Sequence, residues 1–227
     1  AEPIIADVLR KDSRNAAALK LRSTLSLARG QLEPAIADLR QVLNDQPRDA
    51  EVMMLLAIAY ERAGSMELAD KQFADAVRVS NFNDRVGLNY VAFLRRRGNA
   101  ARAEDILLEL AARWPSNVGI LTALGDVRLA RRNWVGAEEI ANVIRRLGDE
   151  RGLAGQIIAA SLTGRQKYDD SIRILQDMYA ASPGAVQPMH ALVNTLVRAQ
   201  QFDRATAFLR TILEKSPSNA EAHVMLG

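Results

Sequence analysis

The chain has 227 residues, of which 48% are hydrophobic, 25% are charged and 5% are aromatic, and it contains no cysteine. The apolar fraction can form a buried core, which excludes wholesale disorder, and the lack of cysteine excludes disulfides, thiol nucleophiles and cysteine-ligated metals. The net charge of +3 is too small for the positive field of a nucleic-acid-binding protein, and no apolar run approaches the ~18 residues of a membrane span. We therefore expect no nucleic-acid partner and no direct membrane insertion.

A regular period runs along the chain. Four prolines mark it, Pro47, Pro115, Pro183 and Pro217, because their sequence numbers differ by 68, 68 and 34, all multiples of 34. In this phase a partial unit at 1–15, containing only a second helix, comes first. Six full units follow at 16–49, 50–83, 84–117, 118–151, 152–185 and 186–219, and 220–227 starts another. The incomplete units at both ends predict a single domain cut from a longer protein.

Each unit is predicted to form two helices. In the second unit, apolar residues recur at helical spacing from Val52 to Tyr60, Ala63–Gly64 interrupts the pattern, and a second stripe runs from Leu68 to Val77. Glycines stand at the same turn position in the first three units, where a left-handed residue can end the first helix: Gly30, Gly64 and Gly98.

Small residues recur at the twentieth position of every unit, in the predicted second helix. The row is Ala35, Ala69, Ala103, Ala137, Ser171 and Ala205. Small side chains at a fixed position allow helices to approach closely. Because one helix hairpin cannot bury its own apolar face, neighbouring hairpins are expected to stack and supply the core.

These residues resemble the tetratricopeptide repeat family, whose unit reads W-x2-L-G-x2-Y, then A-x3-F, then P. The second unit has MMLLAIAY followed by Ala69 and Phe73, and the fourth has LTALGDVR. The resemblance implies an all-α fold, a right-handed α-α superhelix (solenoid) of antiparallel helix hairpins. Gly87 and Gly155 stand where the family usually has Trp, so the third and fifth units are expected to pack less tightly.

Few residues suggest catalysis. The two histidines, His190 and His223, are predicted on the first helices of neighbouring units, and the sequence contains no HExxH, phosphate-binding glycine loop or GxSxG motif. Three acidic pairs are expected at helix N-termini, where they complement the helix dipole: Glu104–Asp105, Glu138–Glu139 and Asp169–Asp170. We therefore expect no enzyme activity, no metal ion and no cofactor.

Nine arginines gather in the third and fourth units: Arg95, Arg96, Arg97, Arg102, Arg128, Arg131, Arg132, Arg145 and Arg146. They indicate either solvated turns between helices or a surface for an acidic protein patch. Nucleic acid is disfavoured because stacking aromatic residues do not accompany them.

The resemblance also implies that the first helices line a concave groove that binds a protein or peptide. The candidate groove residues are Lys20, Thr24, Leu27, Met54, Ile58, Arg62, Arg85, Leu88, Asn89, Arg95, Thr122, Asp126, Gln156, His190 and Asn194. Leu27, Met54, Ile58 and Leu88 are expected to form an exposed apolar strip for an amphipathic helix or extended peptide. In the alternative interpretation, Met54 and Leu88 contact the neighbouring unit instead.

The sequence thus predicts a non-catalytic protein-interaction scaffold. Its turn sequences resemble those of long bacterial arrays, which implies a role in envelope, polysaccharide or secretion assembly and slightly favours the cell envelope or periplasm over the cytoplasm. The alternative is the targeting arm of an enzyme whose catalytic domain lies outside this segment.

Overall fold

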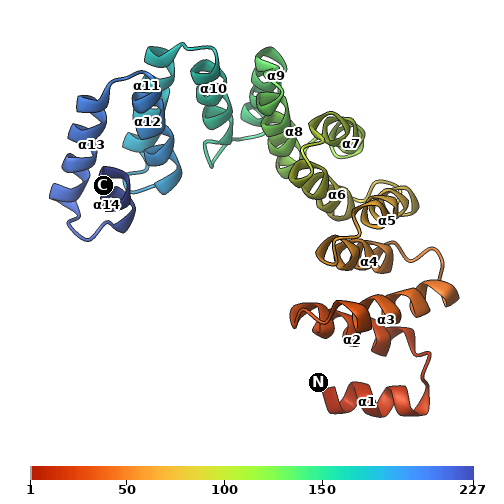
Figure 1. Ribbon diagram of the computed structural model, residues 1–227. Helices are drawn as coiled ribbons and strands as arrows, with labels where there is room; N and C mark the ends of the chain where they lie inside the picture. The colour runs from red at the N-terminus through yellow and green to blue at the C-terminus, as the bar shows by residue number, and fades with distance from the viewer. Residues whose placement is uncertain (1) are drawn as a thin grey trace. The chain divides into compact units, whose positions relative to one another are not determined.

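The computed structural model describes residues 2–227, which fold into α-helices without any strand (Figure 1). The helices are α1 (Glu2–Lys11), α2 (Ala16–Ala28), α3 (Leu32–Asp45), α4 (Ala50–Arg62), α5 (Met66–Val79), α6 (Asp84–Arg96), α7 (Ala100–Arg113), α8 (Val118–Ala130), α9 (Trp134–Arg146), α10 (Leu153–Gly164), α11 (Tyr168–Ala181), α12 (Val186–Arg198), α13 (Phe202–Lys215) and α14 (Ala220–Leu226). They form two compact parts that divide after Pro115, which we call the N-terminal unit and the C-terminal unit. The predicted all-α class is confirmed.

The helices follow the period of the sequence. The second helices of the hairpins begin at Leu32, Met66, Ala100, Trp134, Tyr168 and Phe202, each one period after the one before. Among the first helices only α10 departs from the spacing, since it begins at Leu153 rather than at Gly152. Gly152 has a left-handed backbone (φ +67°), and the Asp149 carboxylate accepts the N–H groups of Leu153 and Ala154 at 2.7 and 2.8 Å.

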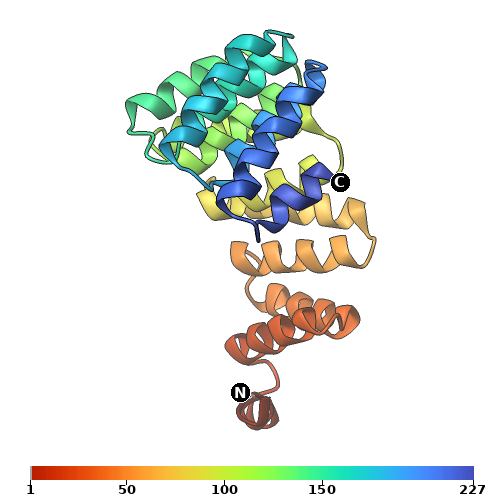
Figure 2. The ribbon, with the colours of Figure 1, turned by 90° about the vertical axis from the view of Figure 1, so that its left-hand side faces the viewer.

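In the N-terminal unit each helix packs against the next from α1 to α6, and α7 packs against α6. Figure 2 shows these helices, coloured red to yellow, lying one above another. First helices also contact each other, α2 with α4 and α4 with α6. Between α5 and α6, the Phe73 ring lies 5.7 Å from Tyr90 and 5.2 Å from Phe93, so an aromatic cluster joins two hairpins.

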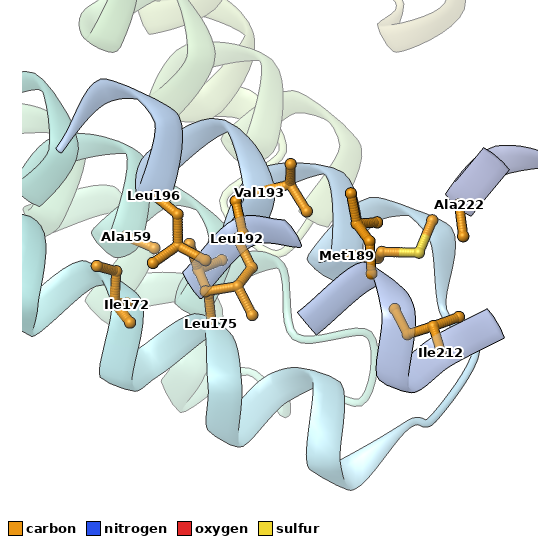
Figure 3. Close-up of a cluster of buried hydrophobic side chains, with 11 residues drawn as sticks. Ala159, Ile172, Leu175, Met189, Leu192, Val193, Leu196, Ile212 and Ala222 are labelled. Atoms are coloured by element: carbon orange, nitrogen blue, oxygen red, sulfur yellow. The ribbon is translucent and has the colours of Figure 1, made fainter. Parts of the chain in front are cut away.

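The C-terminal unit repeats this arrangement from α8 to α14. Its core cluster is centred on Met189, Leu192 and Leu196 of α12, which lie between α11 and α13 (Figure 3). Ile172 and Leu175 of α11 cover α12 from one side, and α13 covers it from the other. No single hairpin supplies this interior, because it draws on α10, α11, α12, α13 and α14.

Small residues mark the helix crossings. The side chains at the twentieth position are almost completely buried in every hairpin, with 0% exposure at Ala35, Ala69, Ala103, Ala137 and Ser171 and 5% at Ala205. The neighbouring rows of larger residues, such as Leu39, Phe73 and Leu107, are also buried. Close helix approach thus occurs where the sequence places alanine.

The expectation of looser packing agrees with the smaller contact between α6 and α7 and between α10 and α11 than within the first, second and fourth hairpins. The glycines themselves, however, leave no empty space. A Cβ atom added to Gly87 would lie 2.6 Å from both Cδ atoms of Leu110, and one added to Gly155 would lie 2.9 Å from the Sδ atom of Met178. The space that a Trp side chain would occupy is therefore filled by a residue of the following second helix. Leu110 is fully buried there.

Helix caps recur with the same period. The residue before most first helices accepts a hydrogen bond from the backbone N–H three residues later, at 2.9–3.2 Å. These caps are Asn15, Asp49, Asn83, Asn117 and Asn219. Such caps stabilise a helix start by about 1 kcal/mol each, so these side chains help to fix where five of the first helices begin.

The turn inside each hairpin requires a left-handed backbone. In the N-terminal unit this position is glycine, with φ of +73°, +78° and +71° at Gly30, Gly64 and Gly98, as predicted. In the C-terminal unit the same position carries Arg132, Gln166 and Gln200 at φ +59°, +62° and +59°. Side chains other than glycine are strained in this region.

The variant Gln166→Gly should therefore raise the free energy of unfolding by about 0.5–1 kcal/mol, because relief of the strain exceeds the added chain entropy. Chemical denaturation of the whole chain checks this. Gly64→Ala is the matched control and should lower stability by about 1 kcal/mol. Equal stability of Gln166→Gly and the wild type would show that the turn is not strained.

Polar side chains of the second and third hairpins are hydrogen-bonded to each other. The Tyr90 hydroxyl donates to Asp70 at 2.8 Å, and Arg102 Nη1 donates to the other carboxylate oxygen of Asp70 at 2.6 Å. The Arg102 guanidinium also lies 5.4 Å from the centre of the Tyr90 ring. Burial, assisted by the hydrogen bond to Asp70, raises the pKa of Tyr90 well above its ordinary value of 10.

Because the folded protein holds the Tyr90 proton more tightly than the unfolded chain, stability should fall as the pH rises above about 10. The variant Tyr90→Phe should lose about 1 kcal/mol at neutral pH through the missing hydrogen bond. Its stability should also fall less steeply above that pH. Denaturation curves over the alkaline range measure both effects, and identical slopes for the two proteins would contradict the assignment.

Candidate partner-binding surface

Within the N-terminal unit, and likewise within the C-terminal unit, the first helices of successive hairpins contact one another and form a layer. We call the outer surface of this layer the first-helix face: α2, α4 and α6 in the N-terminal unit, and α8, α10 and α12 in the C-terminal unit. Every candidate groove residue lies on one of these six helices. The structure gives the candidates different environments, which decide what each could offer a partner.

The predicted exposed apolar strip is wrong for two of its four residues. Leu27 is 6% exposed and Met54 is 3% exposed, while Ile58 and Leu88 are half-buried. The α4 helix contacts both α2 and α6, and its neighbours leave Met54 little surface. The alternative interpretation, that Met54 contacts the neighbouring hairpin, is therefore favoured.

Two of the four charged candidates of the N-terminal unit join neighbouring hairpins. Lys20 of α2 forms ion pairs with Glu51 at 2.7 Å and Asp49 at 3.4 Å, and the hydrogen bond to Glu51 raises the pKa of Lys20 against the opposing effect of burial. Arg62 Nη1 donates to the carbonyl oxygen of Leu27 at 2.9 Å. Both cations therefore take part in contacts between neighbouring hairpins, which leaves them fewer hydrogen-bond donors for a ligand.

The remaining candidates of the N-terminal unit are polar and lie nearer to solvent. Thr24 is exposed, and its hydroxyl donates to the Lys20 carbonyl at 2.9 Å. Half-buried Asn89 donates its amide to the Arg85 carbonyl at 2.8 Å. Arg85 and Arg95 are exposed on α6. This face is thus polar and partly bonded to its own helices.

In the C-terminal unit, two pairs of candidates meet at open cavities. Gln156 and Asn194 line a cavity of about 510 Å³ between α10 and α12, and Thr122 and Asp126 line one of about 630 Å³ beside α8. The Thr122 hydroxyl donates to the Val118 carbonyl at 2.8 Å. His190 is bonded to Glu221 of α14 at 3.0 Å. This pair joins hairpins at the same positions as Lys20 and Glu51 in the N-terminal unit.

The groups considered for catalysis have structural contacts. Besides the His190–Glu221 pair, the His223 ring lies 2.8 Å from the Pro217 carbonyl oxygen. Within residues 2–227, no three His, Asp or Glu side chains come together in a way that could hold a metal ion. Nor does any described helix combine the length and apolar character needed to cross a membrane.

Two of the three acidic pairs are not at helix N-termini. Asp169 and Asp170 occupy the first turn of α11 as predicted, but the pairs beginning at Glu104 and Glu138 lie beyond the first turns of α7 and α9. Glu138 accepts hydrogen bonds from Ser161 at 2.6 Å and Arg165 at 3.1 Å. Glu104 is 7% exposed. These two carboxylates occupy the same row as Asp70, at the joint with the next hairpin.

Several arginines of the basic cluster are bonded within the chain. Arg96 forms two hydrogen bonds to the Glu61 carboxylate at 2.7 and 2.8 Å, and Arg128 donates to the Gly136 carbonyl at 2.9 Å. Together with the Arg102–Asp70 bond, these contacts favour a structural role for part of the cluster.

Comparisons with known proteins support the fold. Two family models described as "Tetratricopeptide repeat" match, one over residues 162–226 and the other over 21–83 and 94–151. The type IV pilus assembly protein PilF of Pseudomonas aeruginosa is 28% identical over 184 residues, which are 80% of this chain and 72% of PilF.

Solved structures agree with these matches. A tetratricopeptide repeat protein from Parabacteroides merdae has a TM-score of 0.77 at 18% identity, over 92% of this chain and 83% of that one. The structure of P. aeruginosa PilF has a TM-score of 0.62 at 22% identity, over 93% and 97%. PilW, described as a widely conserved type IV pilus biogenesis factor, has a TM-score of 0.66 at 12% identity, over 93% and 98%.

The burial of Met54 gives a direct test of the first-helix face. The variant Met54→Glu places a carboxylate in an apolar site and should cost about 3 kcal/mol or more of stability. Arg85→Glu, at an exposed position on α6, is the control and should leave the midpoint of thermal unfolding nearly unchanged. If both variants unfolded at the wild-type temperature, the Met54 side chain would be accessible to solvent, as the predicted apolar strip requires.

Proposed function

The chain belongs to the tetratricopeptide repeat family, and we propose that it is a non-catalytic scaffold that binds a protein or peptide partner on its first-helix face. One observation carries the proposal. In the cavity between α10 and α12, the side chains of Gln156, Gln187 and Asn194 have no hydrogen bond to the described part of the chain. Unused amide groups of this kind can bind the backbone of another polypeptide.

We further propose that the scaffold acts in the assembly of a bacterial envelope structure. The support is likeness to two proteins whose descriptions name such roles, the pilus assembly protein PilF and the pilus biogenesis factor PilW. The partner would then be another component of the same assembly.

Site-specific photo-crosslinking in the source cell tests where the partner binds. A crosslinking amino acid at Arg85 or Asn194 on the first helices should capture the same protein. At Lys71 or Arg210, exposed on the second helices α5 and α13, it should capture none. Capture only from the second helices would contradict the proposal.

Cell fractionation tests the compartment separately. The full-length protein should be recovered with the envelope. Recovery only from the soluble cytoplasmic fraction would remove the envelope role and leave the scaffold role intact.

A further inference from the structure

The cavity between α10 and α12 differs in charge from its neighbour beside α8. The cavity beside α8 is lined by three acidic residues, Asp126, Asp149 and Glu150, and by Arg151. The cavity between α10 and α12 has one charged lining residue, Arg198. Its other lining groups are amides, hydroxyls, alanines, Leu175 and Val197.

The lining hydroxyls belong to the fold. Thr163 of α10 lies 2.8 Å from the Ser171 hydroxyl and 3.2 Å from that of Thr195. Thr195 donates to the Ala191 carbonyl at 2.8 Å, and Ser171 donates to the Ala159 carbonyl at 2.9 Å. This network joins α10, α11 and α12 beneath the cavity, so the hydroxyls fix its base and the amides are left for a ligand.

Four of the residues that line the cavity form a row along α12. Gln187, Ala191, Asn194 and Arg198 are spaced by four, three and four residues, which places them on one side of the helix. The line from Gln187 to Arg198 is about 16 Å long at ~1.5 Å per residue. An extended peptide of about five residues has the same length.

The remaining residues that line this cavity are small or apolar. The lining also includes Ala160 of α10 and Ala191 of α12, whose small side chains leave room for side chains of a ligand. Val197 is 44% exposed beside Arg198. The exposed Arg198 guanidinium has no hydrogen bond or ion pair to the described residues and is the one charged group that lines the cavity.

From this arrangement we infer that the α10–α12 cavity binds an extended segment of the partner protein, about five residues long, with an acidic side chain at Arg198 and an aliphatic one on Val197. Gln156, Gln187 and Asn194 bind the backbone of that segment. The carboxylate receives charge-assisted hydrogen bonds from Arg198. The inference rests on the proposed scaffold function and specifies the chemistry of the partner.

A peptide library tests the inference with the whole chain. The probe is a set of hexapeptides, acetylated and amidated so that no terminal charge remains, in which each position is varied in turn. The wild type should select Asp or Glu at one position over Asn or Gln by about tenfold. Arg198→Gln should lose this selection, and the double variant Gln187→Ala, Asn194→Ala should capture less of every peptide.

Arg210→Gln, at an exposed position on the second helix α13, is the matched control and should select as the wild type does. Circular dichroism and the thermal midpoint confirm that each variant is folded, as expected for exposed positions. The inference fails if the wild type captures none of these capped peptides, if it selects no acidic residue, or if the selection persists in Arg198→Gln. In those cases crosslinking at Arg85 or Asn194 would still decide the scaffold function independently.

Discussion

The contact between the second helix of one hairpin and the first helix of the next holds each unit together. It occurs at α3–α4 and α5–α6 in the N-terminal unit and at α9–α10, α11–α12 and α13–α14 in the C-terminal unit. Alanine or serine at the crossing lets the helices approach, and larger residues such as Phe73 and Leu175 fill the space beside it. Because an isolated hairpin would expose these residues to water, its stability depends on its neighbours.

This dependence also determines which residues a partner can reach. Stacking covers Leu27 and Met54, and it engages Lys20, Arg62 and His190 in bonds between successive hairpins. Side chains that stacking does not engage include Thr24 and Arg85 in the N-terminal unit and the amides lining the cavity between α10 and α12. The first-helix face therefore offers a partner polar and charged groups that do not take part in contacts between hairpins. Such groups favour binding of a partner's backbone and charged side chains over binding of its large apolar side chains.

The sequence predicts the period, the two helices of each hairpin, the buried small residues and the glycine turns, because these features repeat along the chain. Glutamine or arginine can take the same left-handed position, as at Gln166, so the turn survives where the glycine signal is missing. The burial of Met54 and the filling of space at Gly87 by Leu110 could not be predicted, since each depends on a side chain from another helix. Glu138 was expected at a helix start, but α9 begins at Trp134, so Glu138 lies beyond its first turn and accepts a hydrogen bond from Ser161 of the next hairpin.

Hydrogen exchange on the folded chain, comparing the wild type with Ala69→Leu, tests the mutual dependence of hairpins most directly. Ala69 is fully buried, and the larger side chain should overpack the crossing at a cost of about 1–3 kcal/mol. Amide protection should then fall in α4, α5 and α6 and stay at the wild-type level throughout residues 116–227. Loss confined to α5, or equal loss in every helix, would contradict an interior that each hairpin shares with its nearest neighbours.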